Sequence, residues 1–332
     1  MNTIGFVISG KENEWRRALL PKDLARVANP AALYFERGYA SHLRISDIEY
    51  ERFGCCVASR ERVYDCDIIC NPKTPEDCER PLYHDGQALF GWIHAVQGRS
   101  IVDFLLERRM TAIAWEDMFE KGRHCFWRNN EIAGEAAVLH ALPYFGLAAQ
   151  GCEAAVIGLG NCGRGALKIL SQLGARVTCF DRKTVGQLRC DLPRFDIVVN
   201  AVFWDVFRED HLLYCEDLQR MRPGSMIIDI SCDEYMGIES SRPTTIADPV
   251  FEVDGILHYA VDHTPALLHR SATDAISEVV AAYIDQLVSG RLSPCLAKAT
   301  VVSGGVILDE RVKRFQHRES SAPLEVLQYD TV

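Results

Sequence analysis

The chain has 332 residues, which is long for one hydrophobic core and sufficient for two domains of about 150 residues each. Its 48% hydrophobic and 25% charged residues are typical of a soluble globular protein and exclude a largely disordered chain. The formal net charge of -10 argues against nucleic acid as the main partner, because binding a polyanion needs a concentrated basic surface.

The sequence also indicates where the protein works. No window approaches the ~18 consecutive apolar residues that a membrane span needs. The N-terminus has a short apolar run followed by charges, without the basic start, long apolar stretch or cleavage site of a signal peptide. We therefore expect a cytoplasmic protein with no membrane partner.

Strand-like and helix-like segments alternate along the first part of the chain. Alternating or continuous apolar runs predict strands at 3–8, 31–36, 66–70, 87–94 and 110–116, and helical periodicity with capping residues predicts helices at 21–28, 46–54 and 98–109. This alternation is typical of an α/β domain with a mostly parallel sheet.

The alternation restarts after an amphipathic stretch, residues 129–146, that is long enough to link two domains. Strands are predicted at 153–160, 176–181, 195–202, 225–230 and 255–262, and helices at 163–174 and 216–221. A long helix at 272–290 is expected to cross back to the first domain, where 299–316 add a short hairpin and helix. Residues 318–332 lack periodicity and predict a loose tail.

The predicted fold class is α/β, with two Rossmann-like domains whose parallel sheets are flanked by helices and a cleft between them. Residues 1–130 and 285–332 are expected to form a discontinuous substrate (catalytic) domain, and residues 131–284 a dinucleotide-binding domain. Hinges are expected near 128–135 and 268–290, so that closure would expel water from the cleft.

The cysteines do not predict a metal or disulfide framework. There are thirteen of them, an odd number, with no C-x-x-C spacing, and several lie within apolar strand-like runs. Reduced thiols packed as small hydrophobic side chains fit this distribution. We therefore expect no metal site.

A glycine motif marks the predicted cofactor site. Gly158, Gly160 and Gly163 form G-x-G-x-x-G between a predicted strand and a helix, where the backbone must turn tightly and approach a pyrophosphate held by the helix N-terminus. Asn161 and Cys162 lie within this turn and are expected to contact the cofactor too.

The strand at 176–181 ends in Asp181, near the ~20-residue offset at which an acid contacts the ribose. An acid there favours NAD, whereas the adjacent Arg182 and Lys183 favour the 2'-phosphate of NADP. The residues alone leave the choice between the two dinucleotides open.

Four stretches of the first half, "NEWRRALLP", "CDIICNPKTP", "GQALFGWIHAV" and "TAIAWEDM", carry a resemblance to a known superfamily, and it continues through residues 223–265. The chain resembles the alanine dehydrogenase and transhydrogenase superfamily, which includes saccharopine dehydrogenases. "GWIHA", "DRKT", "VDHTP" and "GGVILDERVKRFQHRE" look most like its N5-(carboxyethyl)ornithine synthases. These opine-type enzymes join pyruvate to the side-chain amine of ornithine or lysine.

The resemblance implies catalytic roles for three residues of the first domain. Arg16 matches the arginine that clamps the keto-acid carboxylate, for which a guanidinium offers two parallel donors. Lys73 matches the lysine that polarises the carbonyl, and His94 matches the catalytic histidine, whose near-neutral pKa suits proton transfer. Without the resemblance, a surface arginine, a solvated lysine and a core histidine would be the ordinary interpretations.

The resemblance also assigns residues of the second domain. Asp233 matches an aspartate that faces the cofactor and substrate, although capping a helix is the alternative interpretation. His263 replaces an asparagine that alanine dehydrogenases place near the nicotinamide, and its role stays open. Ala201 and Val202 fall where the family contacts the cofactor, and the match of "DRKT" favours NADPH, with NADH as the alternative.

The implied substrates are a keto acid and an amino acid. Trp92 and Glu116 are candidates for the substrate pocket by position, but they are equally compatible with a core aromatic residue and a surface acid. Strand alternation would put Trp92 and His94 on the same face.

Three functions therefore follow as expectations. The first is an opine-type condensation in which hydride from NAD(P)H reduces an imine of pyruvate and an amino acid. The second is reductive amination with ammonia, as in alanine dehydrogenases, and the third is a non-catalytic NAD(P)-sensing protein. Relatives are commonly oligomers, so a homo-oligomer is compatible with the resemblance.

Overall fold

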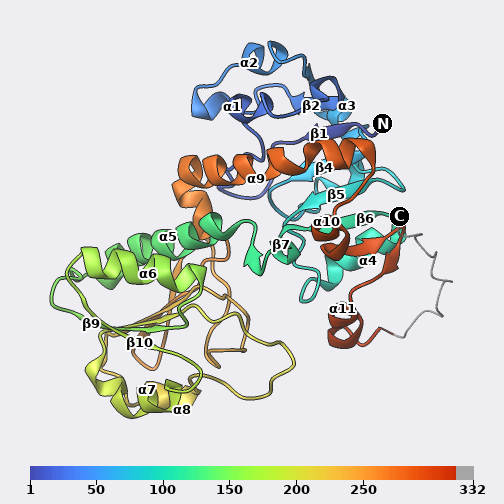
Figure 1. Cartoon of the computed structure of the whole chain (residues 1–332). Coiled ribbons are helices and arrows are strands. Elements are labelled where there is room, and N and C mark those ends of the chain that lie inside the picture. The colour runs from blue at the N-terminus through green and yellow to red at the C-terminus, as the bar shows by residue number, and fades with distance from the viewer. Residues whose placement is uncertain (319–332) are drawn as a thin grey trace.

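The computed structural model describes residues 1–318, and it contains two large sheets (Figure 1). The first has eight strands in the order β16-β15-β6-β5-β4-β1-β2-β3, and the second has six in the order β10-β9-β11-β12-β14-β13. Helices flank both sheets, and this confirms the predicted α/β class. None of the described helices is long and apolar enough to cross a membrane.

The first sheet is parallel from β3 to β6. Its strands are β1 (Ile4–Phe6), β2 (Leu33–Glu36), β3 (Cys56–Ala58), β4 (Ile68–Asn71), β5 (Ala88–Gly91), β6 (Thr111–Ala114), β15 (Thr300–Ser303) and β16 (Val306–Ile307). β15 pairs antiparallel with β6 and β16 antiparallel with β15, so the end of the chain completes the sheet that its beginning starts.

Short helices connect these strands. They are α1 (Pro21–Leu24), α2 (Asp47–Glu51), α3 (Arg60–Tyr64), α4 (Arg99–Glu107), α10 (Pro294–Lys298) and α11 (Glu310–Phe315). The expected helices at 21–28 and 46–54 are therefore shorter than their periodicity predicts, while β3 and α3 were not predicted. A two-stranded ribbon, β7 (Phe119–Glu120) with β8 (Arg123–His124), follows β6.

The second sheet has a Rossmann-like arrangement. Its strands are β9 (Glu153–Ile157), β10 (Arg176–Phe180), β11 (Ile197–Asn200), β12 (Met226–Asp229), β13 (Val250–Val253) and β14 (Ile256–Tyr259), and its helices are α6 (Asn161–Gln172), α7 (Val185–Asp191) and α8 (Cys215–Leu218). All neighbours pair in parallel except β13, an unpredicted edge strand that lies antiparallel to β14.

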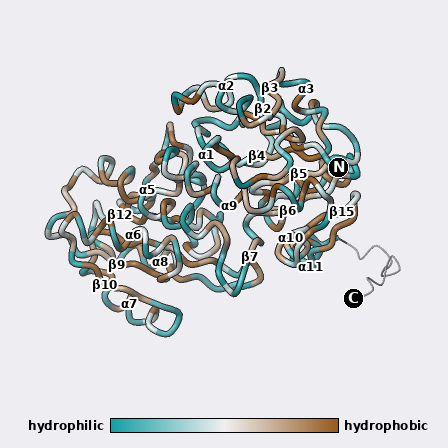
Figure 2. The backbone as a smooth tube through the Cα atoms, turned by 45° about the horizontal axis from the view of Figure 1, so that its top comes forward, coloured by the Kyte–Doolittle hydropathy of each residue, from teal (hydrophilic) through white to brown (hydrophobic). Residues whose placement is uncertain are grey.

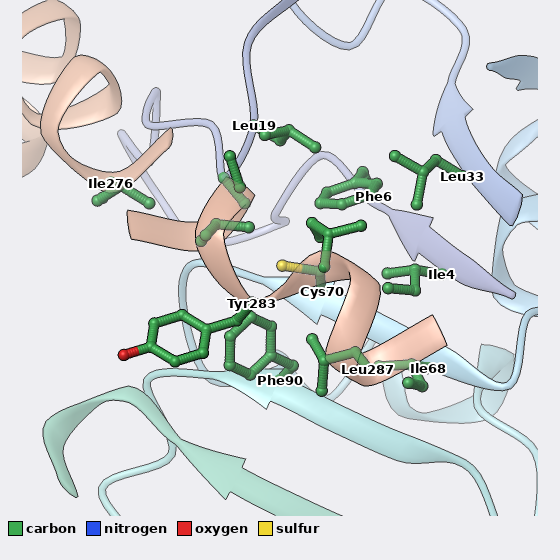
Figure 3. Packing of buried hydrophobic residues seen from close by; sticks show 14 of the residues in the cluster. Ile4, Phe6, Leu19, Leu33, Ile68, Cys70, Phe90, Ile276, Tyr283 and Leu287 are labelled. Atoms are coloured by element: carbon green, nitrogen blue, oxygen red, sulfur yellow. The ribbon is translucent and has the colours of Figure 1, made fainter. Parts of the chain in front are cut away.

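Two long helices join the sheets, namely α5 (Trp127–Phe145) and α9 (His269–Ser289). α9 runs beside β1 and β4 in Figure 1, and its apolar side chains, among them Ile276, Tyr283 and Leu287, pack with Phe6 and Phe90 in the core of the first sheet (Figure 3). The expected boundary at 284/285 thus lies inside a helix that packs on the first domain. The exact division stays a prediction.

Hydrophobic segments run through the interior of both domains, while hydrophilic segments lie at outer turns and helices (Figure 2). All thirteen cysteines have free thiols. Five of them are buried as small apolar side chains, but Cys78, Cys179, Cys190 and Cys215 are exposed. The expected tail, apart from Arg318, lies outside the described residues.

Candidate active site

The predicted catalytic residues of the first domain follow neighbouring parallel strands. Lys73 comes two residues after β4, His94 three residues after β5, and the loop that carries Arg16 follows β1. Because β5, β4 and β1 are adjacent and parallel, these residues lie at the same carboxyl edge of the sheet, where open α/β sheets bind ligands.

His94 lies outside the strand in which we expected it. β5 ends at Gly91, and His94 has a φ of 52°, in the left-handed region that non-glycine residues rarely adopt. The chain turns out of the sheet because the half-buried carboxylate of Glu116 accepts the backbone N–H groups of Ile93 and His94. Such strain is often associated with functional sites.

Trp92 and His94 still lie side by side. Their rings are nearly parallel, with centroids 6.3 Å apart and an interplanar angle of 13°. Trp92 is buried and also packs against Trp115 and Phe126, whereas His94 is open to solvent. Trp92 thus supports the imidazole from the core side.

The environment of His94 disfavours its charged form. Protein atoms crowd around the imidazole, although solvent reaches it, and this desolvation is the main reason why its pKa falls to about 3. The positive charge of Lys73 lowers the pKa further, while the carboxylate of Asp262 opposes this effect. His94 is therefore a neutral imidazole near pH 7, able to accept a proton.

Lys73 is buried and faces an acid of the second domain. Its Nζ lies 3.7 Å from Oδ2 of Asp262, and its backbone N–H donates to Asn71 Oδ1 at 3.1 Å. Burial lowers the pKa of Lys73, against the opposing effect of Asp262. Asp262 lies three residues beyond β14, so this ion pair brings the two domains together at the candidate site.

Asp262 was not predicted as a site residue. Its carboxylate also lies 3.6 Å from Lys11 Nζ and accepts a hydrogen bond from Nδ1 of His263. Burial would raise the pKa of Asp262, but the hydrogen bond from His263 and the charge of Lys73 hold it well below the usual range. Asp262 is therefore ionised among cationic groups.

His263 bridges the domains. It is buried, and its Nε2 lies 2.9 Å from the carbonyl oxygen of Glu12 while Nδ1 faces Asp262. Both of its partners, the carboxylate of Asp262 and the carbonyl oxygen of Glu12, are hydrogen-bond acceptors.

Arg16 is buried and already paired. Its Nε and Nη2 lie 2.8 and 2.5 Å from the two carboxylate oxygens of Glu14, and Nη1 donates to Asn129 Oδ1 at 3.3 Å. The spacing of Glu14 and Arg16 gave no signal in the sequence, and neither Glu14 nor Asn129 was predicted. Nη1 and Nη2 each retain one N–H for a further acceptor.

The side chain of Asp233 contacts the loop that follows His94. Its Oδ1 accepts a hydrogen bond from Gln97 Nε2 at 3.2 Å, which is a further contact between the domains. Burial, followed by the charge of Asp229, raises the pKa of Asp233 to about 6. No described helix begins at the following residue, so Asp233 does not cap a helix.

The glycine turn lies between β9 and the start of α6 and fits a dinucleotide. Gly158 has a φ of 86°, and a Cβ at Gly163 would lie 1.8 Å from the carbonyl oxygen of Gly158, so a larger residue cannot occupy that position. A Cβ at Gly160 would meet no atom within 4 Å, which leaves room for a pyrophosphate at the N-terminus of α6.

The other predicted cofactor residues surround this turn. Asn161 and Cys162 open α6, and burial raises the pKa of the Cys162 thiol to about 11. Ala201 and Val202 follow β11 and contact the turn, because a Cβ at Gly158 would lie 3.1 Å from Ala201 O and from Val202 Cγ2.

Asp181 forms a local turn. Its Oδ1 accepts the backbone N–H groups of Lys183 and Thr184 at 2.9 and 3.0 Å and the Thr184 hydroxyl at 2.9 Å. These bonds occupy one carboxylate oxygen. Arg182 and Lys183 are exposed, and no ion pair holds either of them within residues 1–318.

Comparison with known proteins identifies the family. An alanine dehydrogenase/PNT N-terminal domain model matches residues 9–126, and the corresponding C-terminal domain model matches residues 183–313. An N(5)-(carboxyethyl)ornithine synthase of Clostridium botulinum is 31% identical over 298 residues, which cover 85% of this chain and 93% of the relative. This chain belongs to the alanine dehydrogenase/PNT family.

Other members of this family agree with that placement. An alanine dehydrogenase of Mycobacterium tuberculosis is 26% identical over 354 residues, covering 93% of this chain and 95% of the relative. The solved structure of an L-alanine dehydrogenase superposes with a TM-score of 0.81 at 22% identity, covering 95% of this chain and 99% of that one, which shows the shared fold. Family membership implies a nicotinamide cofactor and an NAD(P)-dependent oxidoreductase.

Proposed function

We propose that this protein catalyses an opine-type condensation of an α-keto acid, most simply pyruvate, with the amine of an amino acid, preferably the side-chain amine of ornithine or lysine. The observation that carries the proposal is the assembly of Lys73 and His94 from the first domain with Asp262 and Asp233 from the second. The 31% identity to an N(5)-(carboxyethyl)ornithine synthase supports the choice of substrates.

Lys73 and Arg16 bind the keto acid in this mechanism. The ammonium of Lys73 hydrogen-bonds the keto oxygen and stabilises the negative charge that develops when the amine attacks. Arg16 offers Nη1 to the carboxylate, while Glu14 and Asn129 fix the orientation of its guanidinium.

His94 moves the protons. As a neutral imidazole it takes a proton from the ammonium of the amino acid, so that the free amine can attack the keto carbon. It returns this proton to the hydroxyl group of the adduct, which leaves as water. An imine then joins the carbon of the keto acid to the amine nitrogen. Asp233, which approaches this region through Gln97, holds the incoming ammonium or a ribose hydroxyl of the cofactor.

The glycine turn would hold the dinucleotide, with Gly158, Gly160 and Gly163 close to its pyrophosphate. When bound, the reduced nicotinamide supplies the hydride that converts the imine into a secondary amine with a carboxyethyl group. We propose NADPH as the cofactor, because Asp181 is engaged in its own turn while Arg182 and Lys183 are available to a 2'-phosphate.

The test is oxidation of NADPH with pyruvate and a panel of amines that includes ornithine, lysine and ammonia, with mass spectrometry of the products. We expect N-(1-carboxyethyl) amino acids. His94→Ala should lower kcat by about 10²- to 10⁴-fold with intact cofactor binding, and His84→Ala, an exposed histidine of the same domain, should not. A panel in which no amine supports NADPH oxidation would contradict the proposal.

The similarity to alanine dehydrogenases favours a second candidate, reductive amination with ammonia. Ammonia far exceeding every amino acid in kcat/KM would establish it. The histidine at position 263, in place of the asparagine of alanine dehydrogenases, argues against this candidate.

A further inference from the structure

Arg17, the neighbour of Arg16, is a buried cation without an acidic partner. Its side chain is 3% exposed, and within residues 1–318 no carboxylate lies within 4.0 Å of the guanidinium. Its hydrogen bonds go to backbone carbonyl oxygens instead: Nε donates to Tyr39, and Nη1 donates to Arg16 at 2.8 Å and to Glu14 at 3.5 Å.

One nitrogen of Arg17 remains free. Nη2 has no hydrogen-bond partner in the described part of the chain, yet it is not among the completely enclosed polar atoms, so solvent or a ligand can reach it. Carbonyl oxygens satisfy the other donors but do not neutralise the charge. A buried charge without a counterion costs several kcal/mol, and burial accordingly lowers the pKa of Arg17.

Arg17 lies on the carboxyl edge that carries the candidate active site. Its backbone N–H donates to Thr273 Oγ1 of α9 at 3.0 Å, and Tyr39, whose carbonyl it binds, follows β2, the neighbour of β1. The edge therefore presents, in order, His94 after β5, Lys73 after β4, the loop of Arg16 and Arg17 after β1, and Tyr39 after β2.

An aromatic row lies close to Arg17. Trp15, which is 47% exposed, has its ring 5.5 Å from that of His42, and the His42 ring is 5.6 Å from that of His269. The charge of Arg17 contributes, after burial, to lowering the pKa of both histidines. This part of the edge thus combines positive charge with aromatic ring surface.

We infer that Arg17 binds the carboxylate of the amine donor, and this inference rests on the proposed function. The product of an opine-type condensation carries two carboxylates, one from the keto acid and one from the amino acid. Arg16 binds the carboxylate of the keto acid, while Lys73 binds its keto oxygen. Arg17 offers the carboxylate of the amino acid a separate guanidinium further along the same edge. The alkyl chain between the two ends lies against the ring of Trp15. Ammonia would need no such group.

The experiment compares ornithine with 1,4-diaminobutane, which has the same amine spacing but no carboxylate, in the wild type and in Arg17→Gln with saturating pyruvate and NADPH. We expect Arg17→Gln to lower kcat/KM for ornithine by about 30-fold or more. The loss for 1,4-diaminobutane should be at least about tenfold smaller. KM for pyruvate, measured in a separate series with saturating ornithine, should change little. Arg26→Gln, an exposed arginine of the same domain, is the matched control.

Equal losses with both amines would overturn the inference, because they would mean that Arg17 only supports the fold through its carbonyl contacts. If Arg17→Gln does not fold, the comparison rests on the wild type. Its kcat/KM for ornithine must then exceed that for 1,4-diaminobutane by a similar factor, and equal values would overturn the inference. If the wild type uses ammonia but neither amine, the proposed function itself fails.

Discussion

The carboxylate of Glu116 accepts the backbone N–H of His94, and it also accepts that of Ile93 at 3.2 Å. Glu116 was expected to line the substrate pocket, but in this position it holds the left-handed turn that aims the imidazole. We assign it a positioning role as a proposal.

Glu116→Gln tests this role. An amide has only one acceptor oxygen, so its NH₂ group would face one of the two backbone N–H donors. Two facing donors repel each other, and the turn would shift. We expect kcat to fall by about 10- to 100-fold through misplacement of His94, with the Kd for NADPH unchanged. Glu107→Gln, an exposed acid on α4, should behave like the wild type. An unchanged kcat in Glu116→Gln would show that Glu116 does not position His94.

The charges near His94 predict opposite effects of two substitutions on its pKa. Lys73→Met removes a positive charge and should raise the pKa of His94 above its value of about 3, although desolvation remains. Asp262→Asn removes a negative charge and should lower it. Titration of the His94 ring by NMR measures both shifts, and shifts of the same sign would contradict the arrangement of the three groups.

The turn at Asp181 predicts the cofactor preference. Replacing Arg182 and Lys183 with alanine should raise the Kd for NADPH by about tenfold or more, because each charge-assisted hydrogen bond to a phosphate contributes about 1.5–3 kcal/mol. The Kd for NADH should change far less. Lys121→Ala, an exposed lysine outside the second domain, is the control. Tighter binding of NADH than NADPH by the wild type would show that Asp181 rearranges to hold a free ribose.

His124 gives a prediction for stability. Its Nδ1 accepts the backbone N–H of Phe126 and its Nε2 donates to the carbonyl oxygen of Glu116, so the fold requires a neutral ring. Burial lowers its pKa to about 4, against about 6.5 in the unfolded chain. The unfolded state therefore binds the extra proton first, and this contribution to stability is present above about pH 6.5 and is lost as the pH falls toward 4.

Replacing His124 with glutamine should reduce this acid sensitivity. The free energy of unfolding, measured by urea titration at pH 7 and pH 4.5, should fall by roughly 2 kcal/mol less in the variant than in the wild type. His84→Gln should leave the difference unchanged. If the free energy of unfolding fell equally in His124→Gln and the wild type, groups other than His124 would cause the acid sensitivity.

Local sequence signals predicted most of the strands, a mostly parallel sheet and the glycine turn, because each depends on residues close together in the chain. The short strands β3 and β13 were missed. The same signals predicted a strand as far as His94, but β5 ends at Gly91. Apolar alternation cannot show that the carboxylate of Glu116, distant in the sequence, accepts the backbone N–H of His94 and turns the chain out of the sheet.

The partners of the candidate catalytic residues could not be predicted in this way. Asp262 meets Lys73 from a strand end of the other sheet, and Asn129 meets Arg16 from the start of α5. Such pairs arise only when distant segments of the chain pack together, so no spacing in the sequence reveals them.

The most direct test of the proposed function is a competition in one tube. The protein is given NADPH, pyruvate and equimolar ammonia and ornithine, and the products are quantified by mass spectrometry. We predict that the N-(1-carboxyethyl) product exceeds alanine by at least about a hundredfold, in keeping with a site that recognises polar groups of its substrate. Alanine as the main product would contradict the proposed function and establish reductive amination with ammonia.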